Sequence, residues 1–343
     1  MIESLRSSLT GFTNDAESLG MKTLRDRFDD VDSALDDVES VLGSLESWEA
    51  PLAAGVATHL VTAGGKRLRP ALMFLCYGAA GGTDLSVARP YAVGCELIHT
   101  ATLLHDDVID DGTERRGKPT ANKSYGDLNA VLSGDYLVAH VINELLELNR
   151  VKPVKKLSRV MTHLVQGELL QDEYSQSFET ETDQYLQIAR LKTSSLFSYA
   201  AWTGGYLVDG DGDLAAQLSN YAENLGIAFQ MVDDVLDFEY EQTGKTPFAD
   251  IQSGTTNLCL ILGMQRSDEL KEKLQLIRDS NSVSPDKHDD IINILRKTSS
   301  LENARSMAKD YSSRARACIE GAPDNAYVSA LDKLADYVYG RLN

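Results

Sequence analysis

The chain has 343 residues, of which 43% are hydrophobic and 25% charged, and this composition is typical of a folded protein rather than a disordered or fibrous one. Aspartate and glutamate total 52 against 33 lysines and arginines, and the net charge of −19 argues against nucleic acid or an anionic lipid surface as a partner. The excess acid fits either ordinary solubility or a halophile-like surface adapted to a salty cytoplasm, where salt screens self-repulsion, and we favour the second interpretation.

Targeting and crosslinking signals are weak along the whole sequence. Residues 1–20 lack a basic segment followed by an apolar core, and no stretch reaches the length of a membrane span. The four cysteines are far apart, without the close pairs of a zinc site or a secreted disulfide framework. We therefore expect a cytoplasmic protein with reduced thiols and no stable membrane insertion.

The periodicity of apolar residues predicts helices almost everywhere. Residues 1–50 are more acidic and less apolar than the rest, and we expect an N-terminal helical extension or a partly ordered leading segment there, followed by one large domain over 51–343. Turn signals fall at 81–82, 118–119, 152–153 and 210–213. The expected fold is an all-α helical bundle whose core can hold a ligand between facing helices. Spacings of three and four residues predict helices over 52–63, 70–80, 86–109, 129–149 and 154–171.

Positive residues gather in two short segments. Lys66, Arg67 and Arg69 follow two glycines, and a flexible turn there can bring three positive side chains to one anion. Arg115 and Arg116 form a second basic pair. Each pair alone is more often a solvated surface patch, so the segments gain meaning only beside acidic groups. Further candidate cations are Lys192 and Lys245.

Two aspartate triplets with the same i, i+1, i+4 spacing carry the strongest chemical signal. Positions i and i+4 share one helix face, so the carboxylates repel one another unless a cation lies between them. Carboxylate oxygens suit magnesium, which keeps several waters and accepts phosphate oxygens as further ligands. The first triplet is Asp106, Asp107 and Asp110, and the second is Asp233, Asp234 and Asp237.

A solvated acidic turn explains one such triplet about as well as a metal site does. Two triplets, each embedded in apolar sequence, favour a clamp for a metal and a diphosphate.

The ordered motifs resemble those of the trans-type isoprenyl diphosphate synthases, also called polyprenyl synthetases. The resemblance covers residues 60–260 and implies an all-α bundle around a deep central cavity, usually a homodimer, with three magnesium ions bound together with diphosphate. The motifs that carry it are GGKRLRP, HTATLLHDDVID, RRGKPTAN, LSGDYL, GELLQ, KTSSLFSYAA and GIAFQMVDDVLD.

The same resemblance assigns roles to individual residues. It implies that magnesium is bound by Asp106, Asp107, Asp110, Asp233 and Asp234, and by Asp237 directly or through water. It implies a pocket for isopentenyl diphosphate formed by Lys66, Arg69, His99 and Arg116. Partners for the allylic diphosphate are Arg115, Lys192 and Lys245, with Lys192 also counted among the catalytic residues, and Thr193 and Gln230 line the reacting chain. His105 is left out, because a histidine beside an apolar helix is commonly structural.

The residues before the first triplet bear on product length. In the family, bulky aromatic residues four or five positions before the first aspartate block the growing chain, but here those positions are Thr102 and Ala101. One turn earlier, Ile98 and Cys95 also lack rings. The resemblance therefore implies geranylgeranyl diphosphate or a longer product.

The segment after Lys245 departs from the family pattern. Phe248 replaces a glycine and Thr255 a lysine, which removes one diphosphate contact worth roughly 1.5–3 kcal/mol, and Asn257 and Cys259 replace a threonine and a proline.

Three functions stay open from the sequence: a chain-elongating synthase, which we favour, a terpene cyclase or lyase on the same fold, and a non-catalytic partner subunit. A cyclase needs no second diphosphate site, and a partner subunit typically loses aspartates.

Overall fold

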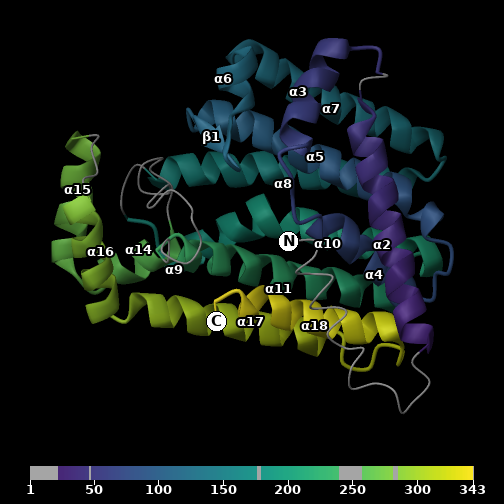
Figure 1. Ribbon diagram of the computed structural model, residues 1–343. Helices are drawn as coiled ribbons and strands as arrows, with labels where there is room; N and C mark the ends of the chain where they lie inside the picture. Colours follow the sequence, from purple (N-terminus) through teal and green to yellow (C-terminus); the bar gives the residue numbers. More distant parts are fainter. Residues whose placement is uncertain (1–21, 46–47, 176–178, 239–256, 281–284, 343) are drawn as a thin grey trace. The chain divides into compact units, whose positions relative to one another are not determined.

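The computed structural model describes residues 22–45, 48–175, 179–238, 257–280 and 285–342 (Figure 1). The chain divides into two compact units. The first comprises residues 1–158, 199–219 and 321–331, and the second comprises 159–198, 220–320 and 332–343. The domain boundary at residue 50 stays a prediction.

The first unit contains the expected N-terminal helix and most of the early motifs. Helix α5 lies against α4 and α7, and α2 lies against α3, α4 and α5 (Figure 1). Residues 22–43 therefore form a helix that is packed onto the unit rather than a detached segment. Its complete elements are α2 (Lys22–Gly43), α3 (Pro51–Val61), α4 (Leu68–Ala79), η3 (Leu85–Val87), α5 (Arg89–Ile109), β1 (Glu114–Arg115), β2 (Lys118–Pro119), α6 (Ala121–Tyr125) and α7 (Asp127–Glu147).

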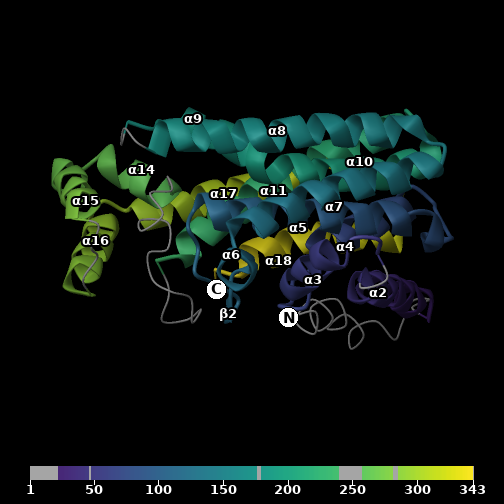
Figure 2. The same cartoon turned by 90° about the horizontal axis from the view of Figure 1, so that it is seen from above.

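The second unit contains the later motifs and the C-terminal helices. Helix α14 lies against α9, α15, α16 and α17, and α14, α15 and α16 are grouped together in both views (Figures 1 and 2). Its complete elements are α9 (Thr182–Ile188), the π-helix η4 (Ala189–Ser194), α14 (Leu258–Met264), α15 (Asp268–Ser280), α16 (Pro285–Lys297) and α17 (Ser300–Cys318). The boundary between the units passes through α8 (Val151–Ser175), α10 (Ser195–Asp209), α11 (Asp213–Leu236) and α18 (Ala326–Gly340).

The predicted helices are confirmed with small shifts of their ends. Proline begins α3 and lies in the first turn of α5, where its missing N–H removes no intrahelical bond. The apolar positions of α5 include Ile98, Ala101 and Leu104, which are buried at three-residue spacing. The all-α fold class is confirmed for the described residues, in which the one sheet is a hairpin of two strands with two residues each.

Two turn predictions were wrong. Lys152 and Pro153 lie in the first turn of α8, because a proline near a helix start fits the helix geometry. Lys118 and Pro119 form strand β2, paired antiparallel with β1. The predicted helix over 86–109 begins instead at Arg89, after the separate short helix η3.

Candidate active site

The first aspartate triplet lies at the C-terminal end of α5. Asp106 is partly exposed, Asp107 is only 2% exposed, and Asp110 is exposed at the helix C-cap. Asp107 Oδ1 accepts a hydrogen bond from Arg115 Nε at 2.8 Å, and it forms an ion pair with Arg115 Nη2, also at 2.8 Å. Its other oxygen is buried and has no hydrogen-bond partner among the described residues, which is unfavourable for a carboxylate in the absence of a ligand.

A tight hairpin brings the two arginines back to this helix end. Arg116 and Gly117 form its two-residue turn, and both have positive φ, 56° and 75°. Positive φ at both central residues is typical of a type I′ turn, which matches the twist of paired strands. His59 Nε2 lies 2.7 Å from the carbonyl oxygen of Pro119 and so ties the hairpin to α3. The turn therefore places Arg115 on Asp107 and leaves Arg116 exposed.

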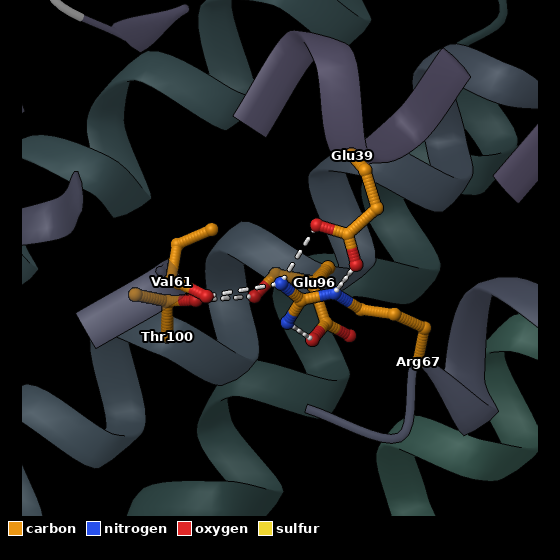
Figure 3. A network of polar contacts seen from close by, with 5 residues as sticks. All are labelled: Glu39, Val61, Arg67, Glu96 and Thr100. Carbon is orange, nitrogen blue, oxygen red and sulfur yellow. Dashed lines mark hydrogen bonds and ion pairs between the residues drawn. The ribbon is translucent and has the colours of Figure 1, made fainter. Parts of the chain in front are cut away.

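Arg67 lies near the other cations, but its guanidinium is engaged by protein carboxylates instead of facing an anion as predicted. Its guanidinium is buried and lies between two carboxylates, as Figure 3 shows. Nε contacts Glu39 of α2 at 2.6 Å, and Nη1 contacts Glu96 of α5 at 2.7 Å. Nη2 donates to Glu39 and to the carbonyl of Val61. Burial opposes the charge on Arg67, but the two glutamates outweigh it and raise the pKa. Arg67 is thus engaged by protein groups, and the proposed trio of anion-binding cations is reduced to Lys66 and Arg69.

Other basic residues of the first unit act on His99 and Arg116. Burial, then Arg69, Arg116, Arg115 and Arg67, lower the pKa of His99 well below its usual value. Partial desolvation, then Arg67 and Arg115, lower the pKa of Arg116. A Cβ added at Gly65 would lie 2.7 Å from Arg67 Nη1 and 3.3 Å from Arg116 Nη1, so the glycine keeps this approach open. These shifts mark a cluster of positive charge that an anion would relieve.

His105 has the structural role that the sequence favoured. Its Nε2 lies 3.2 Å from the carbonyl of Val131 and 3.4 Å from Asp135. A Cβ on Gly134 would lie 2.3 Å from this ring, which explains the glycine in the LSGDYL motif.

In the second unit, η4 positions Lys192 and Thr193. Short π-helices often occur at functional sites, because the extra residue shifts the side chains that follow it. Lys192 Nζ contacts Glu168 at 2.5 Å. A Cβ on Gly167 would meet the Lys192 backbone nitrogen at 2.7 Å, so the GELLQ motif supplies both the space for this helix and the partner of its lysine.

A chain of hydrogen bonds joins η4 to the second triplet. Thr193 Oγ1 donates to Gln230 Oε1 at 2.7 Å, and Gln230 Nε2 donates to Asp234 Oδ1 at 2.9 Å. The backbone nitrogen of Leu258 donates to Asp234 Oδ2 at 2.9 Å. Asn257 caps α14 and donates to the Asp234 carbonyl at 3.1 Å. Asp234, 3% exposed, therefore has a clear structural role, and its function as a metal ligand stays a prediction.

The other two aspartates of the second triplet differ in exposure. Asp237 is 6% exposed, whereas the Asp233 side chain is 30% exposed and contacts Arg341 Nη2 at 2.7 Å. Lys245, Phe248 and Thr255 lie outside the described residues.

Sequence reasoning also missed three partners of the predicted residues in the second unit. Glu168 lies inside a motif already noted, and its acidic side chain was the available signal. Asn257 was noted only as a departure from the family pattern, although asparagine is a preferred N-cap residue. Arg341 is 108 residues from Asp233 and carries no local signal.

The donor set is compatible with a divalent cation that takes most of its ligands from elsewhere. Within the described ranges, no group of three or more His, Cys, Asp or Glu side chains is close enough to hold a metal ion by itself. Magnesium, however, is usually bound by one or two carboxylates together with waters and substrate phosphates. The buried, unsatisfied oxygen of Asp107 and the accessible carboxylates of Asp106, Asp110 and Asp233 fit that pattern.

The fold and these motif residues define an all-α protein. One aspartate triplet lies at the end of α5, beside the cations of the first unit, and the other lies at the end of α11, in the second unit. The polyprenyl synthetase family model matches residues 50–295. The chain therefore belongs to the polyprenyl synthetase family, as its motifs predicted. In the part of the chain that the structure describes, no helix is both long and apolar enough to cross a membrane.

Known proteins resemble the chain over most of its length. It is 34% identical over 299 residues to an all-trans-nonaprenyl-diphosphate synthase (geranyl-diphosphate specific) of Rhodobacter capsulatus, covering 86% of this chain and 91% of that protein. It is 32% identical over 281 residues to the octaprenyl diphosphate synthase of Escherichia coli, covering 81% and 86%. A crystal structure of polyprenyl synthase from Caulobacter crescentus CB15, complexed with calcium and isoprenyl diphosphate, matches with a TM-score of 0.85 and 30% identity, covering 92% and 97%.

Proposed function

We propose that the protein condenses isopentenyl diphosphate head to tail with an allylic diphosphate and releases a trans-polyprenyl diphosphate and diphosphate. The observation that carries this proposal is the cationic cluster beside the acidic end of α5, within one unit. Arg69, Arg115 and Arg116 act on His99 there by lowering its pKa, and Arg115 contacts Asp107. A cluster of this kind suits a second diphosphate next to the one that ionises.

A divalent cation, Mg²⁺, completes the site in this proposal, with three ions bound together with diphosphate. Support comes from the accessible Asp106, Asp110 and Asp233, and from the relative whose structure holds calcium with isoprenyl diphosphate. When bound, the metal supplies positive charge that stabilises the departing diphosphate.

The chain's own residues then divide into two groups. Lys66, Arg69, His99 and Arg116 hold isopentenyl diphosphate, since a partly desolvated cationic cluster binds a polyanion strongly. Arg115 and Lys192 hold the allylic diphosphate, and their carboxylate partners, Asp107 and Glu168, orient them. Lys245 joins this second group from outside the described residues.

The reaction follows from these placements. Positive side chains aimed at the leaving diphosphate stabilise the charge that builds on it, so that the allylic C–O bond breaks. Thr193 and Gln230, which are hydrogen-bonded to each other, line the resulting allylic cation. The double bond of isopentenyl diphosphate attacks this cation, and a proton passes to the released diphosphate to form the new double bond.

The product is geranylgeranyl diphosphate or longer. Ile98 and Ala101 are each 1% exposed on α5, and neither they nor Thr102 has a ring that would stop a growing chain. The nonaprenyl and octaprenyl products in the relatives' names favour the long end of this range. We further propose a homodimer in the cytoplasm.

Neither alternative function has comparable support. A terpene cyclase or lyase needs no site for isopentenyl diphosphate, whereas GGKRLRP and its cationic neighbours are present. A non-catalytic partner subunit does not require both aspartate triplets, and this chain keeps both.

Replacing Asp106 or Asp233 by alanine tests the assignment. Each variant should lose turnover by orders of magnitude, because each removes an accessible carboxylate proposed to bind metal. The helix content, followed by circular dichroism, should stay unchanged. Near-normal turnover in either variant would contradict the metal-site assignment.

A further inference from the structure

The C-terminal end of the chain reaches the second aspartate triplet through Arg341. This residue follows α18, and Arg305 Nη1 secures the segment by donating to the carbonyl of Leu342 at 2.8 Å. Arg341 Nη2 contacts Asp233 Oδ1 at 2.7 Å, and its guanidinium carbon lies 5.0 Å from the centre of the Phe229 ring. Phe229 and Asp233 are one helical turn apart on α11, so the guanidinium is held by one face of that helix.

The guanidinium is only partly satisfied by these contacts. Its side chain is 14% exposed, and Nη1 is buried without a hydrogen-bond partner among the described residues. Arginine has five N–H donors in a planar fork suited to the oxygens of a phosphate, so a buried donor without an acceptor marks unused binding capacity. The neighbouring Asp233 has a side chain that is 30% exposed, whereas Asp234 and Asp237 are only 3% and 6% exposed.

On the basis of the proposed function, we infer that Arg341 is a diphosphate-positioning residue that alternates between two partners. Without metal, it neutralises Asp233 and relieves the repulsion among the carboxylates of the triplet. If Asp233 held a metal ion, Arg341 would lose its anionic partner next to the bound diphosphate. Its guanidinium would then donate to an oxygen of that diphosphate.

Two opposite effects on binding follow from this exchange. Removing the guanidinium frees Asp233, so the bare metal ion no longer competes with an internal cation and binds more tightly. The same change removes a charge-assisted hydrogen bond to diphosphate, which weakens diphosphate binding about tenfold or more. If the ion pair were purely structural, its removal would not strengthen metal binding while weakening diphosphate binding.

The experiment uses the full-length protein and three variants, Arg341→Ala, Arg341→Lys and Arg316→Ala. Arg316 is the matched control, because it ties α17 to α18 through Asp332 at 2.6 Å and Asp336 at 3.0 Å but does not contact Asp233. Mn²⁺ binding is measured by electron paramagnetic resonance without diphosphate. Binding of inorganic pyrophosphate at saturating Mn²⁺ is measured by calorimetry.

The inference predicts that Arg341→Ala binds Mn²⁺ more tightly and pyrophosphate at least about tenfold more weakly than the wild type. Arg341→Lys should recover part of the pyrophosphate affinity, since it keeps the charge but lacks the planar fork. Arg316→Ala should match the wild type in both titrations.

Other results would overturn the inference. Equal affinities in Arg341→Ala and wild type would show that the ion pair does not compete with metal or bind diphosphate. The same changes in Arg316→Ala would assign the effect to loosening of α18. If the wild type did not bind Mn²⁺, both the proposed metal site and the proposed role of Arg341 would be contradicted. Incorporation of isopentenyl diphosphate, measured on the same preparations, decides the proposed function separately.

Discussion

The buried Arg67 network offers the sharpest test of how the N-terminal helix supports the cationic cluster. Arg67→Met removes the cation between Glu39 and Glu96 but keeps an unbranched apolar stem. Glu96 is 4% exposed, and removing one partner of a buried ion pair destabilises a protein by about 3–5 kcal/mol. Glu39, whose side chain is 36% exposed, is screened by water, so Glu39→Gln should lower the free energy of unfolding by only about 1 kcal/mol or less.

An exposed ion pair between α2 and α5, the helices that carry Glu39 and Glu96, provides the control. Arg89 contacts Asp37 at 3.0 Å, and their side chains are 42% and 56% exposed. Arg89→Met should therefore change the free energy of unfolding by less than about 1 kcal/mol.

Urea titrations followed by tryptophan fluorescence measure the free energy of unfolding of the first unit, in which these residues lie. The chain has two tryptophans, Trp48 and Trp202, and both belong to the first unit. The midpoint should fall strongly for Arg67→Met and little for the other two variants, with an unchanged slope. An Arg67→Met loss no larger than that of Arg89→Met would refute the reasoning.

Two further predictions concern the site. Burial and the surrounding arginines lower the pKa of His99 below its usual 6.5, so the unfolded chain takes up this proton at higher pH than the folded protein does, and stability falls as the pH drops below about 6.5. His99→Gln should flatten that fall in urea midpoints measured from pH 7.5 to 5, and an unchanged pH dependence would count against the burial of a neutral His99. Ala101→Phe should shorten the product, because Ala101 is 1% exposed on α5 and an added ring projects into the path proposed for the growing chain. Product sizing checks this, and an unaltered length distribution would remove the argument about the chain-length residues.

Local sequence signals predicted the helices well, because helical periodicity depends on short spacings. The i, i+4 aspartates lie at the ends of α5 and α11 as the periodicity required. The turn at Lys152 and Pro153 was wrong because proline is equally suited to the first turn of a helix.

Partnerships between distant segments could not be predicted. Three cations next to two glycines gave no sign that Arg67 would turn to Glu39 and Glu96, which come from other helices. In the same way, nothing near Arg341 in sequence indicated Asp233. The replacement of a threonine by Asn257 proved compatible with helix capping, since its side chain accepts from Cys259 N and donates to the Asp234 carbonyl.

The most direct test of the central claim is incubation of the purified protein with Mg²⁺, radiolabelled isopentenyl diphosphate and allylic primers of increasing length. Products are sized at low and high salt, with a chelator as the control. The account predicts linear labelled diphosphates of twenty carbons or more that disappear when the metal is removed. Primer consumption without incorporation of label would indicate a cyclase or lyase instead, and no turnover at either salt concentration would contradict a self-sufficient synthase.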